Sequence, residues 1–156
     1  KTGHTFIKQK IRETNAQLGG EMSGHIFFND RWKGFDDGIY AGARMLEIIA
    51  SEDTSDIFSE LPNMVSTPEI NVPASDEGKF FLVEEFIKKT DFSNAKIIDI
   101  DGIRVEFEKG WGLLRASNTS PVLVLRFEAE TEEDLNNIKT IFYENLKRIE
   151  PDIENF

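Results

Sequence analysis

The sequence predicts an α+β fold for residues 65–156, in which an antiparallel sheet carries helices on one face. Between 97 and 127, short apolar stretches separated by turn residues are typical of antiparallel strands. One stretch before this run and one stretch after it have apolar residues spaced as on one face of a helix. Helices that stand apart from a run of strands favour the α+β class.

Composition and charge narrow the class of protein. The 156 residues, 39% of them hydrophobic and 13 of them Phe, are enough to form one domain or two small ones. A formal net charge of −11 argues against nucleic acid and anionic membranes as partners. The absence of cysteine excludes disulfides and thiolate metal sites. No apolar run approaches the roughly 20 residues of a membrane span, and we expect a cytoplasmic protein.

A short amphipathic helix is predicted near the start of the chain, with Thr5 as the candidate N-cap. Its narrow apolar face consists of Phe6, Ile7 and Ile11. The polar stretch 19–25 follows and leads into a short strand at 26–28. The first residue is Lys1 and not Met, and residues 1–4 have no helix or strand start ahead of them. We therefore expect this chain to be a piece of a longer protein.

A second helix is predicted to begin after Asp36 or Asp37, which are interpreted as caps and not as metal ligands, since acidic residues are favoured at a helix N-terminus. Its apolar stripe consists of Ile39, Ala43, Met45, Leu46, Ile49 and Ala50. The acidic stretch 51–64 is predicted to be a linker with a short turn at 57–61. The chain then divides into domains at 1–50 and 65–156.

The second domain is predicted to begin with an edge strand framed by prolines at 68–73. Ser75 or Asp76 is expected to cap the next helix. One face of that helix consists of Phe80, Val83 and Ile87, with Leu82 and Phe86 flanking it.

Two alternating stretches at 97–100 and 103–107 are separated by Asp101-Gly102, which predicts a type I′ hairpin. After a polar loop, the stretch 122–127 is expected to return as a buried strand. Thr131 opens the final helix with a start that resembles a capping box. The inner face of this helix consists of Leu135, Ile138, Phe142, Leu146 and Ile149.

The polar loop between the last two predicted strands has the side chains of an anion site. Arg115 offers a planar fork of donors, and Ser117, Asn118 and Thr119 add side-chain donors and backbone N–H groups. This set suits a phosphate. The alternative is an ordinary turn in which Asn and Ser side chains bond their own backbone. The negative chain repels a phosphate at long range, so such a site depends on local groups.

The loop at 19–25 offers a second polar group. Glu21 accepts hydrogen bonds from hydroxyls, Ser23 both donates and accepts, and His25 adds a ring nitrogen, a combination that suits sugar hydroxyls. The alternative is a surface hairpin with a solvated Glu and a structural His. The only histidines are His4 and His25, and the spacing of a helical two-histidine metal motif is absent.

Read together, these loops and two further runs resemble bacterial phosphomannomutase/phosphoglucomutase, within the α-D-phosphohexomutase family. The runs are Gly-Glu-Met-Ser-Gly-His at 20–25, Gly-Phe-Asp-Asp-Gly-Ile-Tyr at 34–40, Ser-Thr-Pro-Glu-Ile-Asn at 66–71 and the stretch from Gly-Trp-Gly-Leu-Leu-Arg-Ala-Ser-Asn-Thr-Ser-Pro to Phe-Glu-Ala at 110–129. Four motifs in order are far more specific than one. The Met at position 22 resembles the residue found in the branch of the family that accepts both mannose and glucose phosphates.

The resemblance implies the organisation of the chain. The family has four domains, and residues 1–50 resemble the C-terminal part of the third, sugar-binding α/β domain, which is then incomplete. Residues 65–156 resemble the fourth, phosphate-binding domain. The resemblance further implies interconversion of hexose 1-phosphate and hexose 6-phosphate through a phosphoserine and a bisphosphorylated sugar.

The resemblance also implies roles for single residues. Glu21, Ser23, His25 and His4 match the sugar site, and Arg115, Ser117, Asn118 and Thr119 match the loop that binds the phosphate that is not transferred. The family's phosphoserine loop and its Asp-rich Mg²⁺ loop have no counterpart here, so no catalytic or metal residue is assigned to this chain. We therefore expect Mg²⁺ to bind outside the chain and the chain alone to be inactive.

Partners follow from the same resemblance. They are mannose and glucose 1- and 6-phosphates, the missing N-terminal domains of the same enzyme and, through the truncated domain, a second copy by self-association. The alternative is a noncatalytic phosphosugar-binding or interaction module that retains the fold.

Overall fold

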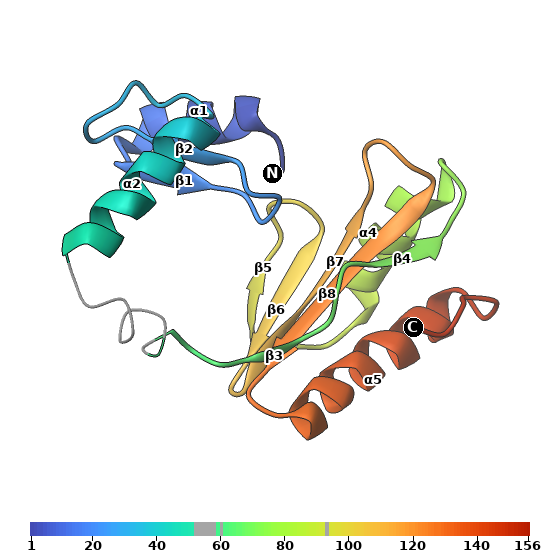
Figure 1. Cartoon of the computed structure of the whole chain (residues 1–156). Coiled ribbons are helices and arrows are strands. Elements are labelled where there is room, and N and C mark those ends of the chain that lie inside the picture. Colours follow the sequence, from blue (N-terminus) through green and yellow to red (C-terminus); the bar gives the residue numbers. More distant parts are fainter. Residues whose placement is uncertain (52–58, 60, 93) are drawn as a thin grey trace. The chain divides into compact units, whose positions relative to one another are not determined.

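The computed structural model describes residues 1–51, 59, 61–92 and 94–156. These residues form two compact units, Lys1–Pro62 and Asn63–Phe156, and each unit is described by itself (Figure 1). The turn predicted at 57–61 lies largely outside the described residues. No helix in the described part of the chain is long and apolar enough to cross a membrane.

The first unit begins with helix α1 (His4–Thr14), which packs on a hairpin of β1 (Leu18–Gly20) and β2 (Ile26–Phe28). The helix ends at Asn15, whose φ of 52° is left-handed. Gly19 lets the hairpin approach the helix closely, because a Cβ there would lie 2.9 Å from Ile11 Cδ1. The predicted cap was wrong: Gly3 holds the N-cap position, and Thr5 lies inside the helix.

Helix α2 (Gly38–Ser51) confirms the second predicted helix and one of its two candidate caps. The Asp37 carboxylate accepts from the backbone N–H of Tyr40 at 2.9 Å, whereas Asp36 contacts His25. No residue of α2 is buried, and the predicted stripe is exposed, with Ile39 89% accessible. The stripe therefore has no covering layer among the described residues.

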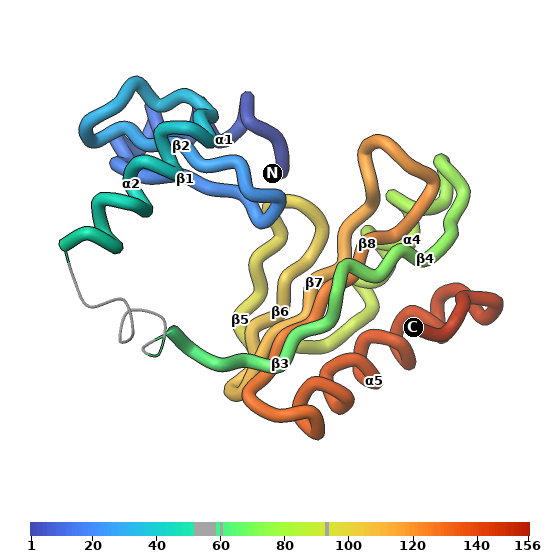
Figure 2. Tube along the Cα trace, in the orientation of Figure 1, coloured from blue at the N-terminus to red at the C-terminus, as the bar shows by residue number. Residues whose placement is uncertain are grey.

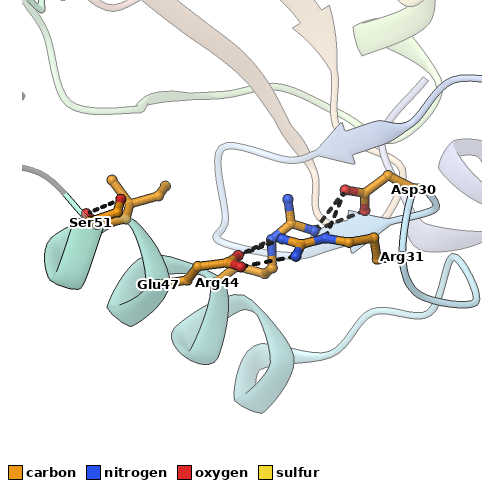
Figure 3. Close-up of polar contacts among 6 residues, drawn as sticks. Asp30, Arg31, Arg44, Glu47 and Ser51 are labelled. Atoms are coloured by element: carbon orange, nitrogen blue, oxygen red, sulfur yellow. Dashed lines mark hydrogen bonds and ion pairs between the residues drawn. The ribbon is translucent and has the colours of Figure 1, made fainter.

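An ion-pair network attaches α2 to the segment after β2 (Figure 3). Arg44 donates to Asp30 at 2.8 and 2.9 Å, and Arg31 forms a two-pronged pair with Glu47. Hydrogen bonds from the Arg31 side chain lower the pKa of Glu47. The pKa of Asp30 is also lowered, chiefly by the Arg31 backbone N–H. All four groups are partly accessible to water, so the network orients α2 more than it stabilises it.

The second unit is an antiparallel sheet with both helices on one side (Figures 1 and 2). The predicted fold class is confirmed. Its strands are β3 (Val65–Ser66), β4 (Ile70–Pro73), β5 (Lys96–Ile98), β6 (Ile103–Phe107), β7 (Gly110–Ala116) and β8 (Val122–Ala129). The order is β3-β8-β7-β6-β5, and β4 also pairs with β8, which confirms it as an edge strand. The helices are α4 (Gly78–Lys89) and α5 (Glu132–Ile149).

The core lies between the sheet and the two helices. Ile103, Leu114 and Leu125 form one row across three paired strands and are at most 1% exposed. Gly112 makes room for the α5 side chain Phe142, because a Cβ would lie 2.5 Å from its ring. The α5 start is confirmed, since Thr131 Oγ1 accepts from Asp134 N at 3.1 Å. Of its predicted inner face, Leu135, Ile138, Phe142 and Leu146 are buried, and Ile149 is partly buried.

Helix α4 differs from its prediction in start and in face. Ser75 does accept from the backbone N–H of Gly78 at 2.9 Å, but the helix begins only at Gly78, and Asp76 instead pairs with Lys79. The buried positions are Lys79, Leu82, Val83 and Phe86, while Phe80 and Ile87 are exposed. Leu82, Val83 and Phe86 are thus buried as predicted, but a buried lysine joins the inner face in place of Phe80 and Ile87, so hydrophobicity alone set the edges of this face incorrectly.

The β5–β6 hairpin forms, but its turn is not type I′. Ile98 pairs with Arg104, so the connection 99–102 is longer than two residues. Type I′ needs a positive φ at both central residues, and only Gly102, at 82°, has one. A Cβ on Gly102 would lie 2.3 Å from Leu114 O and 2.7 Å from Arg115 Cα. The turn therefore packs against the end of β7, which determines its shape.

Candidate functional site

In the first unit, the loop 21–25 joins β1 to β2 as a tight turn. Gly24 N donates to Glu21 O at 3.0 Å, and Glu21 N donates to His25 O at 2.9 Å. Gly24 has a φ of 89°, which a residue with a Cβ rarely adopts. Met22 and Ser23 stand exposed at the tip. The predicted sugar residues Glu21, Ser23 and His25 thus share one short, closed turn.

Glu21 links this turn to the start of α1. Its Oε2 accepts from Gly3 N at 3.1 Å, which brings the neighbouring His4 to the same region. Its Oε1 is buried and has no hydrogen-bond partner among the described residues. A buried carboxylate oxygen without a donor is unfavourable, so Glu21 is an acceptor whose bonding is incomplete in this structure.

His25 is held by a partner that the sequence did not indicate as such. Its Nδ1 lies 2.7 Å from Asp36 Oδ2. The bridge between Phe27 and Asp36 places this carboxylate beside β2. With Nδ1 engaged, His25 has Nε2 left for another contact. A pair of residues 11 positions apart has no sequence signature, and the sequence predicts only a capping role for the acidic pair at 36–37.

In the second unit, the loop 117–121 joins β7 to β8 and is closed by Ser117. The hydroxyl of Ser117, which is 7% exposed, accepts from the backbone N–H groups of Thr119 at 3.3 Å and Ser120 at 3.1 Å. Ser117 N donates to Val122 O at 3.0 Å. The turn predicted as the alternative therefore exists, and it leaves Asn118 and Thr119 exposed at its tip.

Arg115 lies next to this loop, near the end of β7. Its neighbour Leu114 faces the helices, so Arg115 faces the opposite side of the sheet. The Arg115 side chain is 19% accessible, and its Nη1 lies 3.9 Å from Asp101 Oδ2. The guanidinium is thus partly sheltered but still reaches solvent, as an anion-binding arginine requires.

The start of α4 supports the same loop. Ala74 N donates to Pro121 O at 2.9 Å, and the buried Lys79 ammonium donates to Ser120 O at 2.9 Å. Neither contact was predicted, because they join positions 41 or more apart. Together with Ser117, they hold both ends of the loop.

A metal ion needs a group of ligands around it. No group of three or more His, Asp or Glu side chains that could hold one occurs among the described residues.

The fold and the two loops define an α+β protein with one polar loop in each of two units, and comparison with known proteins identifies its family. The family model "Phosphoglucomutase/phosphomannomutase, alpha/beta/alpha domain III" matches residues 1–65. The model "Phosphoglucomutase/phosphomannomutase, C-terminal domain" matches residues 69–145. The chain belongs to the phosphoglucomutase/phosphomannomutase family.

Relatives of known sequence support this assignment. The chain is 53% identical over 156 residues to a phosphomannomutase/phosphoglucomutase of Pseudomonas syringae, and the match covers 99% of this chain and 34% of that protein. It is 53% identical over 146 residues to a phosphoglucomutase of Neisseria gonorrhoeae, with coverage of 91% and 32%. The chain thus spans about a third of the length of these relatives.

A solved structure agrees with the fold. The crystal structure of a phosphoglucomutase/phosphomannomutase family protein from Burkholderia thailandensis superposes with a TM-score of 0.90 at 47% identity. The match covers 100% of this chain and 33% of that one. The expected resemblance is therefore confirmed at the level of the family.

Proposed function

We propose that this chain binds hexose phosphates as part of a phosphohexomutase. The observation that carries the proposal is the position of Arg115, whose partly sheltered guanidinium lies beside a loop held at both ends with Asn118 and Thr119 exposed at its tip. A guanidinium and two neighbouring side-chain donors match the oxygens of a phosphate. Relatives at 53% identity are named phosphomannomutase/phosphoglucomutase, which supports this ligand class.

The first unit contributes the sugar contacts in this proposal. Glu21 has one carboxylate oxygen that is buried without a donor, and Ser23 is exposed at the tip of the same turn. His25 is oriented by Asp36, and His4 follows the glycine that donates to Glu21. These groups are suited to hydroxyls, which both donate and accept. In domain terms, we assign 1–50 to sugar binding, 51–64 to the linker and 65–156 to phosphate binding.

In the proposed reaction, this chain binds the substrate, and the rest of the enzyme carries out the phosphoryl transfer. A phosphoserine outside the chain transfers its phosphoryl group to the bound hexose phosphate, the bisphosphorylated sugar turns over, and the serine takes the phosphoryl group back from the other end. Mg²⁺, which we expect to bind outside this chain, would supply charge stabilisation for that transfer. Arg115 and the 117–120 loop bind the phosphate that stays, so they position the substrate instead of reacting with it.

Magnitudes indicate weak binding by the chain alone. Two or three charge-assisted hydrogen bonds of about 1.5 to 3 kcal/mol each must exceed an association cost of at least about 4 kcal/mol. The expected affinity is on the order of millimolar or weaker. The chain without its phosphoserine and metal loops should have no mutase activity.

The test is an amide NMR titration of the chain with glucose 1-phosphate and mannose 1-phosphate, with inorganic phosphate as the control. We expect all three to shift the amides of 115–120, and only the sugars to shift those of 21–25. Sugar phosphates that shift neither loop at any accessible concentration would contradict binding by this chain. Mutase turnover by the purified chain would contradict the assignment of catalysis to other domains.

A further inference from the structure

Lys79, in the first turn of α4, is an almost fully buried cation next to the 117–121 loop. It is 4% exposed, and its ammonium donates to Asp76 Oδ1 at 2.7 Å and to Ser120 O at 2.9 Å. Burying an ammonium is unfavourable unless it is paired and hydrogen-bonded. The other buried residues of α4 are apolar, so a methionine at this position would also pack. The lysine therefore has a role that core packing does not explain.

The contact with Ser120 restrains the loop from one side. Ser120 O has two donors, Lys79 Nζ and Val122 N at 2.9 Å, and the next carbonyl, Pro121 O, accepts from Ala74 N. On the other side, the Ser117 hydroxyl holds the amides of Thr119 and Ser120. The tip of the loop thus lies between two restraints, one internal and one from α4.

We propose that Lys79 is a positioning residue for phosphate binding: it holds the Ser120 carbonyl and so keeps the loop tip in the conformation that receives the phosphate. This inference rests on the proposed phosphate-binding role of the loop. The Asp76 carboxylate that pairs with Lys79 is itself 77% exposed, so it compensates the buried charge while still solvated. Lys79 acts through the loop backbone and does not itself contact the ligand.

The test compares three variants of this chain. Lys79→Met keeps the apolar stem and removes the donor, Lys79→Arg restores a cation, and Lys89→Met removes a surface lysine that pairs with Glu85 on the same helix. The readouts are ¹⁵N relaxation of amides 117–120 and the affinity for inorganic phosphate. We expect Lys79→Met to weaken phosphate binding at least about fivefold, the scale of one ordinary lost hydrogen bond. It should also mobilise these amides.

The two control variants separate positioning from general stability. Lys79→Arg should recover most of the affinity and order, and Lys89→Met should match the unchanged chain in both. A folded Lys79→Met variant with ordered 117–120 amides and unchanged phosphate affinity would overturn the proposal. If Lys79→Met does not fold, the test is made on the unchanged chain by NMR. A slowly exchanging Lys79 ammonium that couples to the Ser120 carbonyl supports the proposal. An ammonium without this coupling overturns it.

The same experiment distinguishes this inference from the proposed function. If the unchanged chain does not bind phosphate at any accessible concentration, the phosphate-binding role of the loop fails. The relaxation measurement on amides 117–120 still decides whether Lys79 orders the loop.

Discussion

Asp101 Oδ2 lies 3.9 Å from Arg115 Nη1, so the guanidinium proposed to bind phosphate already faces a carboxylate. Asp101 comes from the β5–β6 connection, and Arg115 from the end of β7. A phosphate that approaches Arg115 therefore meets a negative charge beside it.

Asp101→Asn should tighten phosphate binding. Removing the carboxylate removes a repulsion of about 1 kcal/mol or less at a partly exposed site, so we expect a two- to fivefold gain in affinity, about the scale of that energy. The measurement is an NMR titration with inorganic phosphate at low salt. The control is Asp99→Asn in the same connection. Weaker binding in Asp101→Asn would show that the carboxylate holds Arg115 in place instead of competing with phosphate.

Gly102→Ala should destabilise the second unit. The residue has a φ of 82°, and a Cβ would lie 2.3 Å from Leu114 O, so both backbone strain and steric overlap result. Strain of this kind is worth about 1 to 3 kcal/mol. Urea unfolding, followed through NMR signals of β7, measures the loss.

The matched control is Gly42→Ala, on the exposed face of α2. A Cβ there meets nothing within 4 Å, so the change should stabilise α2 by about 0.5 to 1 kcal/mol. Equal effects of the two substitutions would contradict the close packing of Gly102 on Arg115.

Ser117→Ala should loosen the phosphate loop with little effect elsewhere. The substitution leaves the N–H groups of Thr119 and Ser120 without their acceptor, at about 1 kcal/mol in the free energy of unfolding. Amide hydrogen exchange at positions 119 and 120 should accelerate. Ser120→Ala is the control, because that side chain is exposed and its carbonyl is kept. Unchanged exchange in Ser117→Ala would mean that the hydroxyl does not close the loop.

The folded first unit should become less stable in acid through Glu47. Arg31 lowers the pKa of Glu47 below its ordinary value of 4.5. A carboxylate with a lowered pKa contributes stability above its unfolded pKa, and this contribution is lost as pH falls through the folded value. The α2 amide signals, followed from about pH 6 to about pH 3, should show this loss. Glu47→Gln should reduce it, and Glu144→Gln on α5 should not. Identical acid profiles would contradict the pair.

The helices and strands of this chain were largely predictable, because caps and apolar spacing are local. Asp37 and Thr131 both cap as predicted. The errors arose where a distant contact decides. Lys79 turns inward toward Ser120, 41 positions away, and so the buried face of α4 includes Lys79 and leaves out Phe80 and Ile87. Gly102 packs on Leu114, which gives the hairpin a longer turn.

In the candidate site, too, local features were predictable and distant contacts were not. Its residue types were readable as two polar loops, but the groups that orient them were not. Asp36 holds His25, and Lys79 supports the loop after Arg115, through contacts that no sequence pattern specifies.

The central claim, that Arg115 and its loop bind the phosphate of a hexose phosphate, is tested most directly by replacing that arginine. The measurement is the glucose 1-phosphate titration of Arg115→Ala, beside Arg148→Ala, which removes an exposed arginine from the end of α5. The account predicts that Arg115→Ala loses the shifts of amides 117–120, while Arg148→Ala keeps them at unchanged affinity. Equal affinity in both variants would contradict it.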